Sequence, residues 1–514
     1  MTQFPMLSVI VFTPLVGALI ALLLPRRVAW GWGVAIALAD LALTLALIPL
    51  TSTGVGYQFV EHVTWLPDLG INYSLGVDGL SLFLLSLNAL LTLVALVASW
   101  PQAREGDRIR GYVALMLLLA GAMQGLFLAT NVFLFYIFWE LMLVPAYLLV
   151  GMFGGQRRAY AAIKFVLYTS VGSLLMLIGI IWLGVVVSSN GMTSFTLDLP
   201  TLLRLGVPGS AQNVLFLAFM AAFAVKAGIF PLHSWAPDAY VEAPAPVVVL
   251  VAGVMAKTAI YGMLRLVLPL FPLGVHTYFP LVGTLTVIGI LYFALQALIS
   301  NDFKRLLAYV SLSHMSVIVL GVFALNAQGV QGAILQMINH GIVIAALFLI
   351  AAAIESRVET RRITEFGGLA TRLPWLATAF LIASLSALGL PGLNSFAGEF
   401  LAFMGAFHAN QVYGIGATLV VIPAAWYMLR FFQGVMEGPA PEDGPVASAT
   451  KRSGRKLGDL RWHEWLALMP LIALIFYLGI VPATVTTRTE PVTQQIVSAA
   501  QQSQAAGVGA TSHN

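Results

Sequence analysis

The stretch Ala224-Val-Lys226-Ala-Gly-Ile-Phe-Pro231-Leu-His-Ser-Trp235 places a lysine and a proline inside an otherwise apolar run. Proline removes one backbone hydrogen bond and clashes with the preceding turn, so we expect the helix to break there. A second stretch, Leu390-Pro391-Gly-Leu-Asn-Ser-Phe396, interrupts a later run in a similar way. Broken backbone at membrane depth needs protein or a watery cavity to satisfy it. Paired broken helices in corresponding halves favour a transporter built from inverted repeats, which we take as a hypothesis.

The composition excludes most soluble and redox classes. Of the 514 residues, 60% are hydrophobic and only 9% are charged, whereas soluble domains carry about 25% charged residues. Cysteine is absent, which excludes cysteine-ligated iron–sulfur clusters, thiolate zinc sites and disulfides. The sequence contains no phosphate-binding loop and no dinucleotide fingerprint. We therefore expect a membrane protein without a cofactor or metal of its own, and no nucleic-acid partner.

Apolar runs long enough to cross a membrane recur along the whole chain. A crossing needs about 20 mainly apolar residues. The first run lacks a basic leader and a small-residue cleavage site, so we interpret it as a retained helix. We predict an all-α polytopic membrane protein with about 14 transmembrane helices, of which helices 7 and 12 are broken. The runs lie near 6–25, 30–50, 76–100, 111–128, 131–153, 163–188, 211–235, 242–268, 278–299, 304–325, 329–355, 374–409, 412–436 and 464–486.

Basic residues alternate between the loops of this arrangement. The odd-numbered loops hold 18 of the 25 basic residues, and the even-numbered loops hold only Arg204. Because Lys and Arg are retained on the cytoplasmic side, the odd loops should face the cytoplasm and both termini should lie outside. A wrong helix count would have scrambled this alternation.

The predicted domain organisation follows from these runs. A segment rich in Pro, Gly, Ser and charge should form a flexible cytoplasmic loop, and the Gln- and Ala-rich tail should be disordered. The segments are 1–110 (helices 1–3), 111–268 (first repeat, helices 4–8), 278–436 (second repeat, helices 9–13), 437–463 (flexible loop), 464–486 (helix 14) and 487–514 (tail).

Three charged residues near the middle of predicted helices carry the first functional signal. A charge at the centre of a membrane helix costs about 2.5–3.5 kcal/mol on insertion scales, so it needs a partner, a cavity or a function. Glu140 has only apolar neighbours in sequence, and Lys226 precedes the Pro231 break by about one turn. We interpret both as proton-carrying groups, with a static ion pair as the alternative. Lys257 could pass a proton on from Lys226; the alternative is a snorkelling lysine.

The second half of the chain offers three further candidates. Glu399 follows the second break and could be the terminal carboxylate, or a surface glutamate beside a loop. His314 and His340 lie on successive helices at similar depth. Imidazole titrates near neutral pH, which suits a relay between lysines, although a buried histidine is often only a satisfied core residue.

Other polar residues in or beside the runs have structural interpretations. We expect Asp40 to make a structural or inter-subunit contact, and Asp78 to cap the helix that it precedes. Arg265 and Arg430 lie nearer the helix ends and should snorkel. Trp139 and Trp235 should be packing or interface residues.

These residues and their order resemble the antiporter-like subunits of respiratory complex I (NADH–quinone oxidoreductase), and most closely the M-type subunit, also called chain 4. The resemblance covers roughly residues 60–435. The motifs that carry it are Gly76-Val-Asp-Gly-Leu-Ser81, Phe138-Trp-Glu-Leu-Met-Leu-Val-Pro145, the stretch from Ala224 to Trp235, Lys304-Arg-Leu-Leu-Ala-Tyr309 with Ser313-His-Met315, and Leu390-Pro-Gly392 with Gly398-Glu-Phe400.

The resemblance implies fourteen helices with two inverted five-helix repeats, helices 4–8 and 9–13. It also implies proton translocation coupled to quinone reduction in partner subunits of the L, N and K types, with lipid around the bundle. Quinone and NAD(P)H or ferredoxin would be used by those partners. Glu140 matches the helix-5 glutamate, Lys226 the helix-7 lysine that pairs with it, and Lys257 the connecting lysine. His314, His340 and Glu399 match the central axis and the helix-12 acid.

Position 399 separates the M type from its relatives. L- and N-type subunits and Mrp-type sodium–proton antiporter subunits typically carry lysine there, so Glu399 favours the M type. Two alternatives stay open: an Mrp-type antiporter subunit, and a mainly structural membrane-arm subunit. We expect the bacterial cytoplasmic membrane as the location, with a thylakoid membrane as the alternative.

Overall fold

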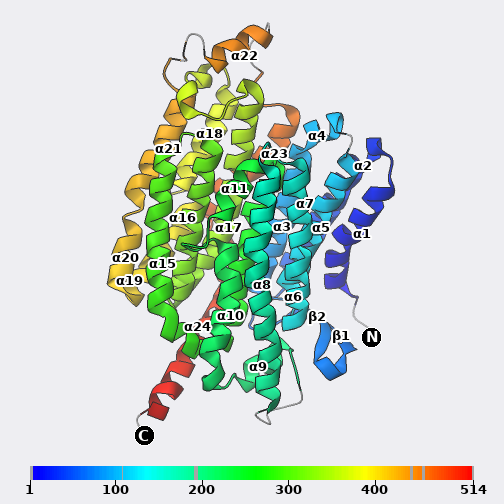
Figure 1. Cartoon of the computed structure of the whole chain (residues 1–514), viewed down its shortest axis with the longest axis vertical. Helices are drawn as coiled ribbons and strands as arrows, with labels where there is room; N and C mark the ends of the chain where they lie inside the picture. Colours follow the sequence, from blue (N-terminus) through cyan, green and yellow to red (C-terminus); the bar gives the residue numbers. More distant parts are fainter. Residues whose placement is uncertain are drawn as a thin grey trace.

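The computed structural model describes residues 4–106, 108–189, 195–439, 441, 444–453 and 458–511. Figure 1 shows long helices lying side by side, with a β-hairpin at the lower end and α22 at the upper end. Within this described part, thirteen helices are long and apolar enough to cross a membrane, and the shorter apolar helix α18 (Pro374–Ala387) adds to them. The prediction of an all-α bundle of about fourteen crossings is confirmed.

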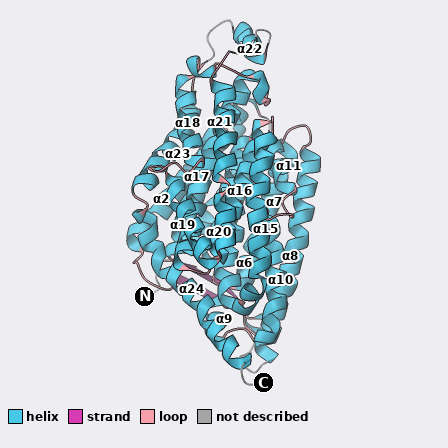
Figure 2. Ribbon diagram, turned by 90° about the vertical axis from the view of Figure 1, so that its left-hand side faces the viewer, coloured by secondary structure: helices cyan, strands magenta, loops and turns pink. Residues whose placement is uncertain are grey.

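The crossings are built from single and composite helices (Figures 1 and 2). In the first half they are α1 (Met6–Leu23), α2 (Arg26–Leu50), α3 (Gly79–Ala98), α5 (Ile109–Leu128), α6 (Val132–Leu141) with α7 (Leu143–Phe153), α8 (Arg158–Ser189), α10 (Gly209–Ala227), and α12 (Ala245–Leu250), η2 (Val251–Met255), α13 (Ala256–Gly262), η3 (Met263–Val267) and α14 (Leu268–Leu270) as one crossing. In the second half they are α15 (Pro272–Ile299), α16 (Phe303–Phe323), α17 (Ala327–Val358), α18 followed after the second break by α19 (Asn394–Ala409), α20 (Gln411–Thr418) with α21 (Val421–Met436), and α23 (Trp462–Ile480).

Shorter elements and a long terminal helix complete the chain. They are β1 (Gln58–Leu66), β2 (Ile71–Val77), α4 (Trp100–Glu105), α9 (Leu199–Leu205), α11 (Trp235–Glu242), α22 (Pro445–Ser453), α24 (Ala483–Thr511) and three 3₁₀ turns (Pro67–Leu69, Ile363–Glu365 and Leu369–Thr371).

Some helices are enclosed by protein and others form the rim. The most hydrophobic part of the crossing Ala245–Leu270 is entirely buried, and 94% of the corresponding part is buried in α16 and in α17. In α2, only 28% of the corresponding part is buried. A helix that is apolar all round is buried or faces lipid. The enclosed helices are therefore the natural place for polar side chains that must avoid lipid.

Both predicted breaks are present and end their helices in the same way. Gly228 follows α10 with φ +72°, and Gly389 follows α18 with φ +69°. At each break the glycine N–H bonds to the carbonyl three residues earlier, and the next N–H bonds to the carbonyl five residues earlier. This is the Schellman arrangement, which satisfies the last carbonyls of a helix and needs a left-handed residue. Identical endings support the repeat hypothesis, which stays a prediction.

Three sequence expectations need correction or restriction. The segment between α2 and α3 contains the antiparallel hairpin β1–β2, which the all-α prediction omitted. The tail from 487 was expected to be disordered, but it belongs to helix α24 (Ala483–Thr511), which buries Val492 and Thr493. Figure 1 shows α24 at the lower end of the molecule, with its last turns projecting below the other helices. Within the expected flexible loop 437–463, Pro445–Ser453 is helical and several other residues lie outside the described part.

The packing of α23 against the second break gives a stability prediction. A Cβ on Gly479 would lie 2.3 Å from the Gly392 carbonyl oxygen and 2.6 Å from the Leu393 backbone, whereas a Cβ on Gly31 would meet nothing within 4 Å. Gly479→Ala should therefore destabilise the protein by about 1–3 kcal/mol. Gly31→Ala should be neutral or slightly stabilising. Thermal unfolding of the purified complex checks this, and equal melting temperatures for the two variants would contradict it.

Candidate functional site

A row of ionisable side chains crosses the centre of the bundle. The ammonium of Lys257, on α13, lies 2.7 Å from Nδ1 of His340 on α17 and donates to the Ala252 carbonyl at 2.6 Å. The ring of His340 is 5.5 Å from that of His314 on α16. Nε2 of His314 lies 3.7 Å from Oε1 of Glu399 on α19. Four helices thus bring four of the six predicted residues into one continuous polar row.

The backbone around Lys257 is unusual. Five-residue π-helical turns, η2 and η3, lie on either side of α13, and the carbonyl that receives the Lys257 ammonium belongs to η2. Single π turns inside α-helices are rare and occur frequently at functional sites. The sequence run Val247-Val-Val-Leu-Val-Ala-Gly gave no sign of them, because π turns have no simple residue pattern.

Glu399 is enclosed by a glutamine and a glycine. Gln336, on α17, donates its side-chain N–H to Oε1 of Glu399 at 2.9 Å. The other carboxylate oxygen lies beside Gly389, where a Cβ would approach it to 2.8 Å. The carboxylate therefore sits against the second break, and the Glu399 side chain is only 14% exposed. The alternative of a surface glutamate is wrong.

Polar side chains hold the second break against α17. Asn339 donates to the Asn394 carbonyl at 2.6 Å, and Ser386 donates to the Asn394 side-chain oxygen at 2.6 Å. Asn339 precedes His340 directly in sequence. The break and the histidine row are therefore parts of one packed unit.

The second cluster lies in the first half of the chain. The Lys226 ammonium is 4.2 Å from the centre of the Trp139 ring, which is a cation–π contact. Lys226 is 2% exposed. Glu140 and Lys226 form no ion pair of 4.0 Å or less, although the Glu140 charge acts on Lys226, and Oε1 of Glu140 is buried without a hydrogen-bond partner. Trp139 is thus a direct partner of Lys226, whereas the sequence predicted a packing or interface residue.

Several buried polar atoms along these clusters have no partner among the described residues. Buried polar groups are almost always hydrogen-bonded, to protein or to ordered water. Three of these atoms belong to residues of the two clusters and suit hydrated positions: Oε1 of Glu140, Nε2 of His340 and Oε1 of Gln336.

The remaining polar predictions have mixed outcomes. Asp78 caps α3 through Leu80 and Ser81, as predicted. Arg265 does not snorkel: it is 9% exposed and forms an ion pair with Asp78. The reason is that the chain supplies a buried carboxylate within its reach. Asp40 is 1% exposed and accepts from Gln124 at 2.9 Å, so its described contact is within the chain.

The sequence interpretation missed Gln336, Asn339 and Asn394, and it named Trp139 only as a packing or interface residue. The available signal was the same one that identified the histidines, namely a polar side chain within an apolar run. His233, inside the first break, was also missed; it is 9% exposed and its ring lies 4.6 Å from that of Phe293. Among the described residues there is no group of three or more His, Asp or Glu that could hold a metal ion.

Comparison with family models identifies the family to which this chain belongs. Residues 129–423 match the family model described as NADH:quinone oxidoreductase/Mrp antiporter, TM. The chain therefore belongs to the NADH:quinone oxidoreductase/Mrp antiporter family. All six predicted site residues, from Glu140 to Glu399, lie inside the matched range.

Individual members of the NADH:quinone oxidoreductase/Mrp antiporter family cover nearly the whole chain. It is 36% identical over 494 residues to NADH-quinone oxidoreductase subunit M of Rickettsia conorii, spanning 94% of this chain and 97% of that protein. It is 38% identical over 448 residues to subunit M of Rhodobacter capsulatus, spanning 86% and 85%.

Solved structures agree with this assignment. A chain of respiratory complex I from Thermus thermophilus with bound NADH superposes with a TM-score of 0.86 at 32% identity, covering 96% of this chain and 99% of that one. A chain of the Mrp complex from a Dietzia species has a TM-score of 0.83 at 23% identity, covering 97% and 100%. The second match is evidence for the fold alone.

The Gln336–Glu399 contact generates a prediction about the site. Gln336→Leu removes the only described hydrogen-bond donor to Glu399, and leaves a buried carboxylate without compensation. We expect the variant to assemble but to lose much of its proton translocation. Dye-quenching of acidification in inverted membrane vesicles measures this.

The matched control is Gln328→Leu. Gln328 lies on the same helix, and its described contact is with the exposed His408. We expect normal translocation in this variant. Equal losses in both variants would show that Gln336 has no special relation to Glu399.

Proposed function

We propose that this chain is a proton-translocating membrane-arm subunit of an NADH–quinone oxidoreductase, which couples quinone reduction in partner subunits to proton pumping. The observation that carries the proposal is the buried row from Lys257 through His340 and His314 to Glu399. Such groups are costly in a membrane unless they serve transport or pair internally. The chain itself supplies no redox centre, so electron transfer belongs to partner subunits.

The proposed proton route begins at the first cluster. Protons enter from the cytoplasmic side in the first half of the chain and load Lys226. A redox-driven change in neighbouring subunits alters the distance between Glu140 and Lys226. When Glu140 is distant, its charge stabilises the Lys226 ammonium less, so Lys226 passes its proton toward Lys257. The cation–π contact with Trp139 gives the ammonium a resting position apart from Glu140.

The second half of the route follows the central row. Lys257 and His340 are in direct hydrogen-bond contact, so a proton can pass between them without an intermediate. The gaps from His340 to His314 and from His314 to Glu399 are longer, and the unpaired atoms around them suit bridging waters. Moving one charge against 100 mV costs about 2.3 kcal/mol, so the release step must be driven.

The proposal extends to the membrane in which the chain lies, its orientation and its partners. The bacterial origin of the relatives supports the bacterial cytoplasmic membrane. The basic loops border the upper end of the bundle in Figure 1, where α4 and α22 lie, so this end faces the cytoplasm and both termini lie outside. Exposed apolar side chains on α8 and α21 suit lipid or L-, N- and K-type neighbours. The electron donor is NADH, with NAD(P)H or ferredoxin as alternatives.

The two alternative functions have weaker support. An Mrp-type antiporter subunit agrees with the fold, but the relatives from Rickettsia conorii and Rhodobacter capsulatus carry the name subunit M, and position 399 is a glutamate. A purely structural arm would not explain why four titratable groups are buried in one row, which is costly in a membrane. That reading predicts little effect when these groups are neutralised singly.

Replacing Lys226 tests the proposed function. Lys226→Ala should leave assembly intact but sharply reduce proton pumping and the quinone reduction coupled to it, because the first proton carrier is lost. Proton uptake and NADH oxidation are measured together in inverted vesicles. Undiminished pumping would reject the mechanism.

Lys164→Ala provides the matched control for Lys226→Ala. Lys164 also lies on a crossing helix, but it forms an ion pair with Asp238 at 2.8 Å and is partly exposed. This variant should retain pumping, since partly exposed ion pairs contribute little.

Pumping stimulated by sodium in the unmodified complex would favour the antiporter alternative.

The absence of cysteine permits a clean test of topology. Ser448→Cys lies in α22 at the predicted cytoplasmic end, and Gln494→Cys lies on α24 at the opposite end. Both positions are exposed. An impermeant thiol reagent should label Gln494→Cys in right-side-out vesicles and Ser448→Cys only in inverted ones. The reverse pattern would overturn the proposed orientation.

A further inference from the structure

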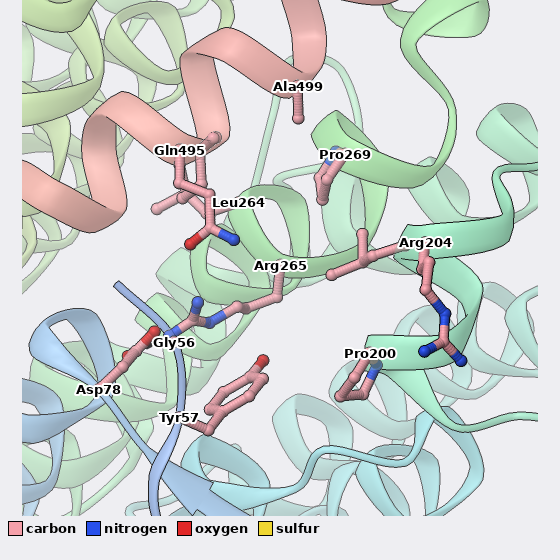
Figure 3. Close-up of a pocket in the computed structure, with 12 residues that line it drawn as sticks. Gly56, Tyr57, Asp78, Pro200, Arg204, Leu264, Arg265, Pro269, Gln495 and Ala499 are labelled. Carbon is pink, nitrogen blue, oxygen red and sulfur yellow. Dashed lines mark hydrogen bonds and ion pairs between the residues drawn. The ribbon is translucent and has the colours of Figure 1, made fainter. Parts of the chain in front are cut away.

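A cavity at the outer end of the bundle is not used by the route described above. Its volume is about 510 Å³. Figure 3 shows the side chains that surround it, with Asp78, Arg265 and Tyr57 on one side and Arg204 on the other. The C-terminal helix α24 borders it through Gln495, Ile496 and Ala499. Segments from five separate parts of the chain thus build one pocket, in which charged and polar side chains lie among apolar ones.

The cavity is lined by a buried ion pair. Arg265 donates through Nη2 to Oδ1 of Asp78, and the two residues are 9% and 3% exposed. Oδ1 also receives the backbone N–H groups of Leu80 and Ser81 at 3.1 Å. Every described hydrogen bond to this carboxylate ends on Oδ1. The other oxygen is therefore available to water or to an incoming proton.

A second, independent observation at Arg265 supports the presence of water in the cavity. Its Nε is buried and has no hydrogen-bond partner in the described structure. A buried donor of a charged group without a partner is expensive, so the adjoining space should contain water. Burial raises the pKa of the Tyr57 phenol, which keeps this neighbour protonated and able to donate. The guanidinium lies 5.4 Å from the Tyr57 ring centre.

The ion pair is linked to the central row through one membrane crossing. Arg265 lies on the same crossing as Lys257, two helical turns farther toward the outside, or about 12 Å along the axis. Tyr261 lies one turn from each; its ring centre is 5.3 Å from the Arg265 guanidinium carbon. Arg265 itself belongs to the π-helical turn η3. The crossing that holds Lys257 therefore ends at the cavity.

We propose that Asp78 and Arg265 form an outer proton-release gate for Lys257, and that the cavity beside them is its water-filled exit. This inference rests on the proposed function and adds a second way out, separate from Glu399. A proton from the Lys257 ammonium, carried past Tyr261 by water, binds the free oxygen of Asp78 and leaves neutral Lys257. The neutral acid holds Arg265 less tightly. Loss of that proton to cavity water restores the carboxylate and the ion pair.

Neutralising Asp78 tests the gate. Asp78→Asn keeps an N-cap for α3, because asparagine caps helices about as well as aspartate. It cannot bind the transferred proton. We expect assembled complex with a partial loss of proton pumping, because the route through Glu399 remains. The double variant Asp78→Asn with Arg265→Gln removes the uncompensated arginine charge and should recover stability without recovering pumping. Recovery of both in the double variant would overturn the gate and leave a structural ion pair.

Glu464→Gln is the matched control. Glu464 pairs with Arg357 at 2.7 Å near the opposite end of the molecule, and the Arg357 side chain is only 3% exposed. This variant should lose stability but retain pumping. If Asp78→Asn pumps normally while Lys226→Ala is defective, the gate is overturned and the proposed function stands. Normal pumping in both would overturn the proposed function.

Blocking the cavity provides a test that does not disturb the ion pair. Gln495→Cys lines the cavity, whereas the adjacent Gln494→Cys does not. Right-side-out membranes are treated with a bulky impermeant maleimide, inverted, and assayed, with the unmodified chain as background. Modification of Gln495→Cys should lower pumping by about as much as Asp78→Asn does, and modification of Gln494→Cys should leave it unchanged. Full pumping after complete modification of Gln495→Cys would overturn the exit. This test remains valid even if Asp78→Asn fails to assemble.

Discussion

A charge enclosed by apolar helices needs a partner that other helices must bring to it, and this constraint organises the whole bundle. Lys257 finds a carbonyl in a π-helical turn and a histidine on α17. Lys226 finds the face of an indole ring. Arg265 finds the carboxylate that caps α3. Apart from that carbonyl, which belongs to the same crossing as Lys257, each partner comes from another helix, so the burial of charge depends on how the helices pack.

The interruptions in the helices solve part of that problem. A regular α-helix has no free backbone groups to offer, whereas a break or a π turn exposes carbonyls and leaves room for side chains. The second break places Gly389 against the Glu399 carboxylate and Asn394 against Asn339. Irregular backbone therefore lies where the ionisable groups are, and it is enclosed by α16 and α17, which scarcely meet lipid.

Neutral polar residues link the ionisable ones. Gln336 holds the Glu399 carboxylate, and atoms without partners lie along the row. Such a network is stable only when water completes it, and hydration is also what lets protons move between groups too far apart for direct transfer. The same physical feature would thus serve stability and transport.

Composition, apolar run length and two prolines predicted a membrane bundle of about fourteen helices with two breaks, and ionisable residues in apolar runs predicted the six candidate site residues. Hydrophobicity and proline act locally, so they can be interpreted along the chain. The tertiary structure alone decided which groups meet: His340 with Lys257, Gln336 with Glu399, Trp139 with Lys226 and Asp78 with Arg265. It also revealed the β-hairpin and the ordered helix α24, because both depend on packing against the finished bundle. Contacts between residues far apart in sequence arise from the relative placement of helices, and no local pattern encodes that placement.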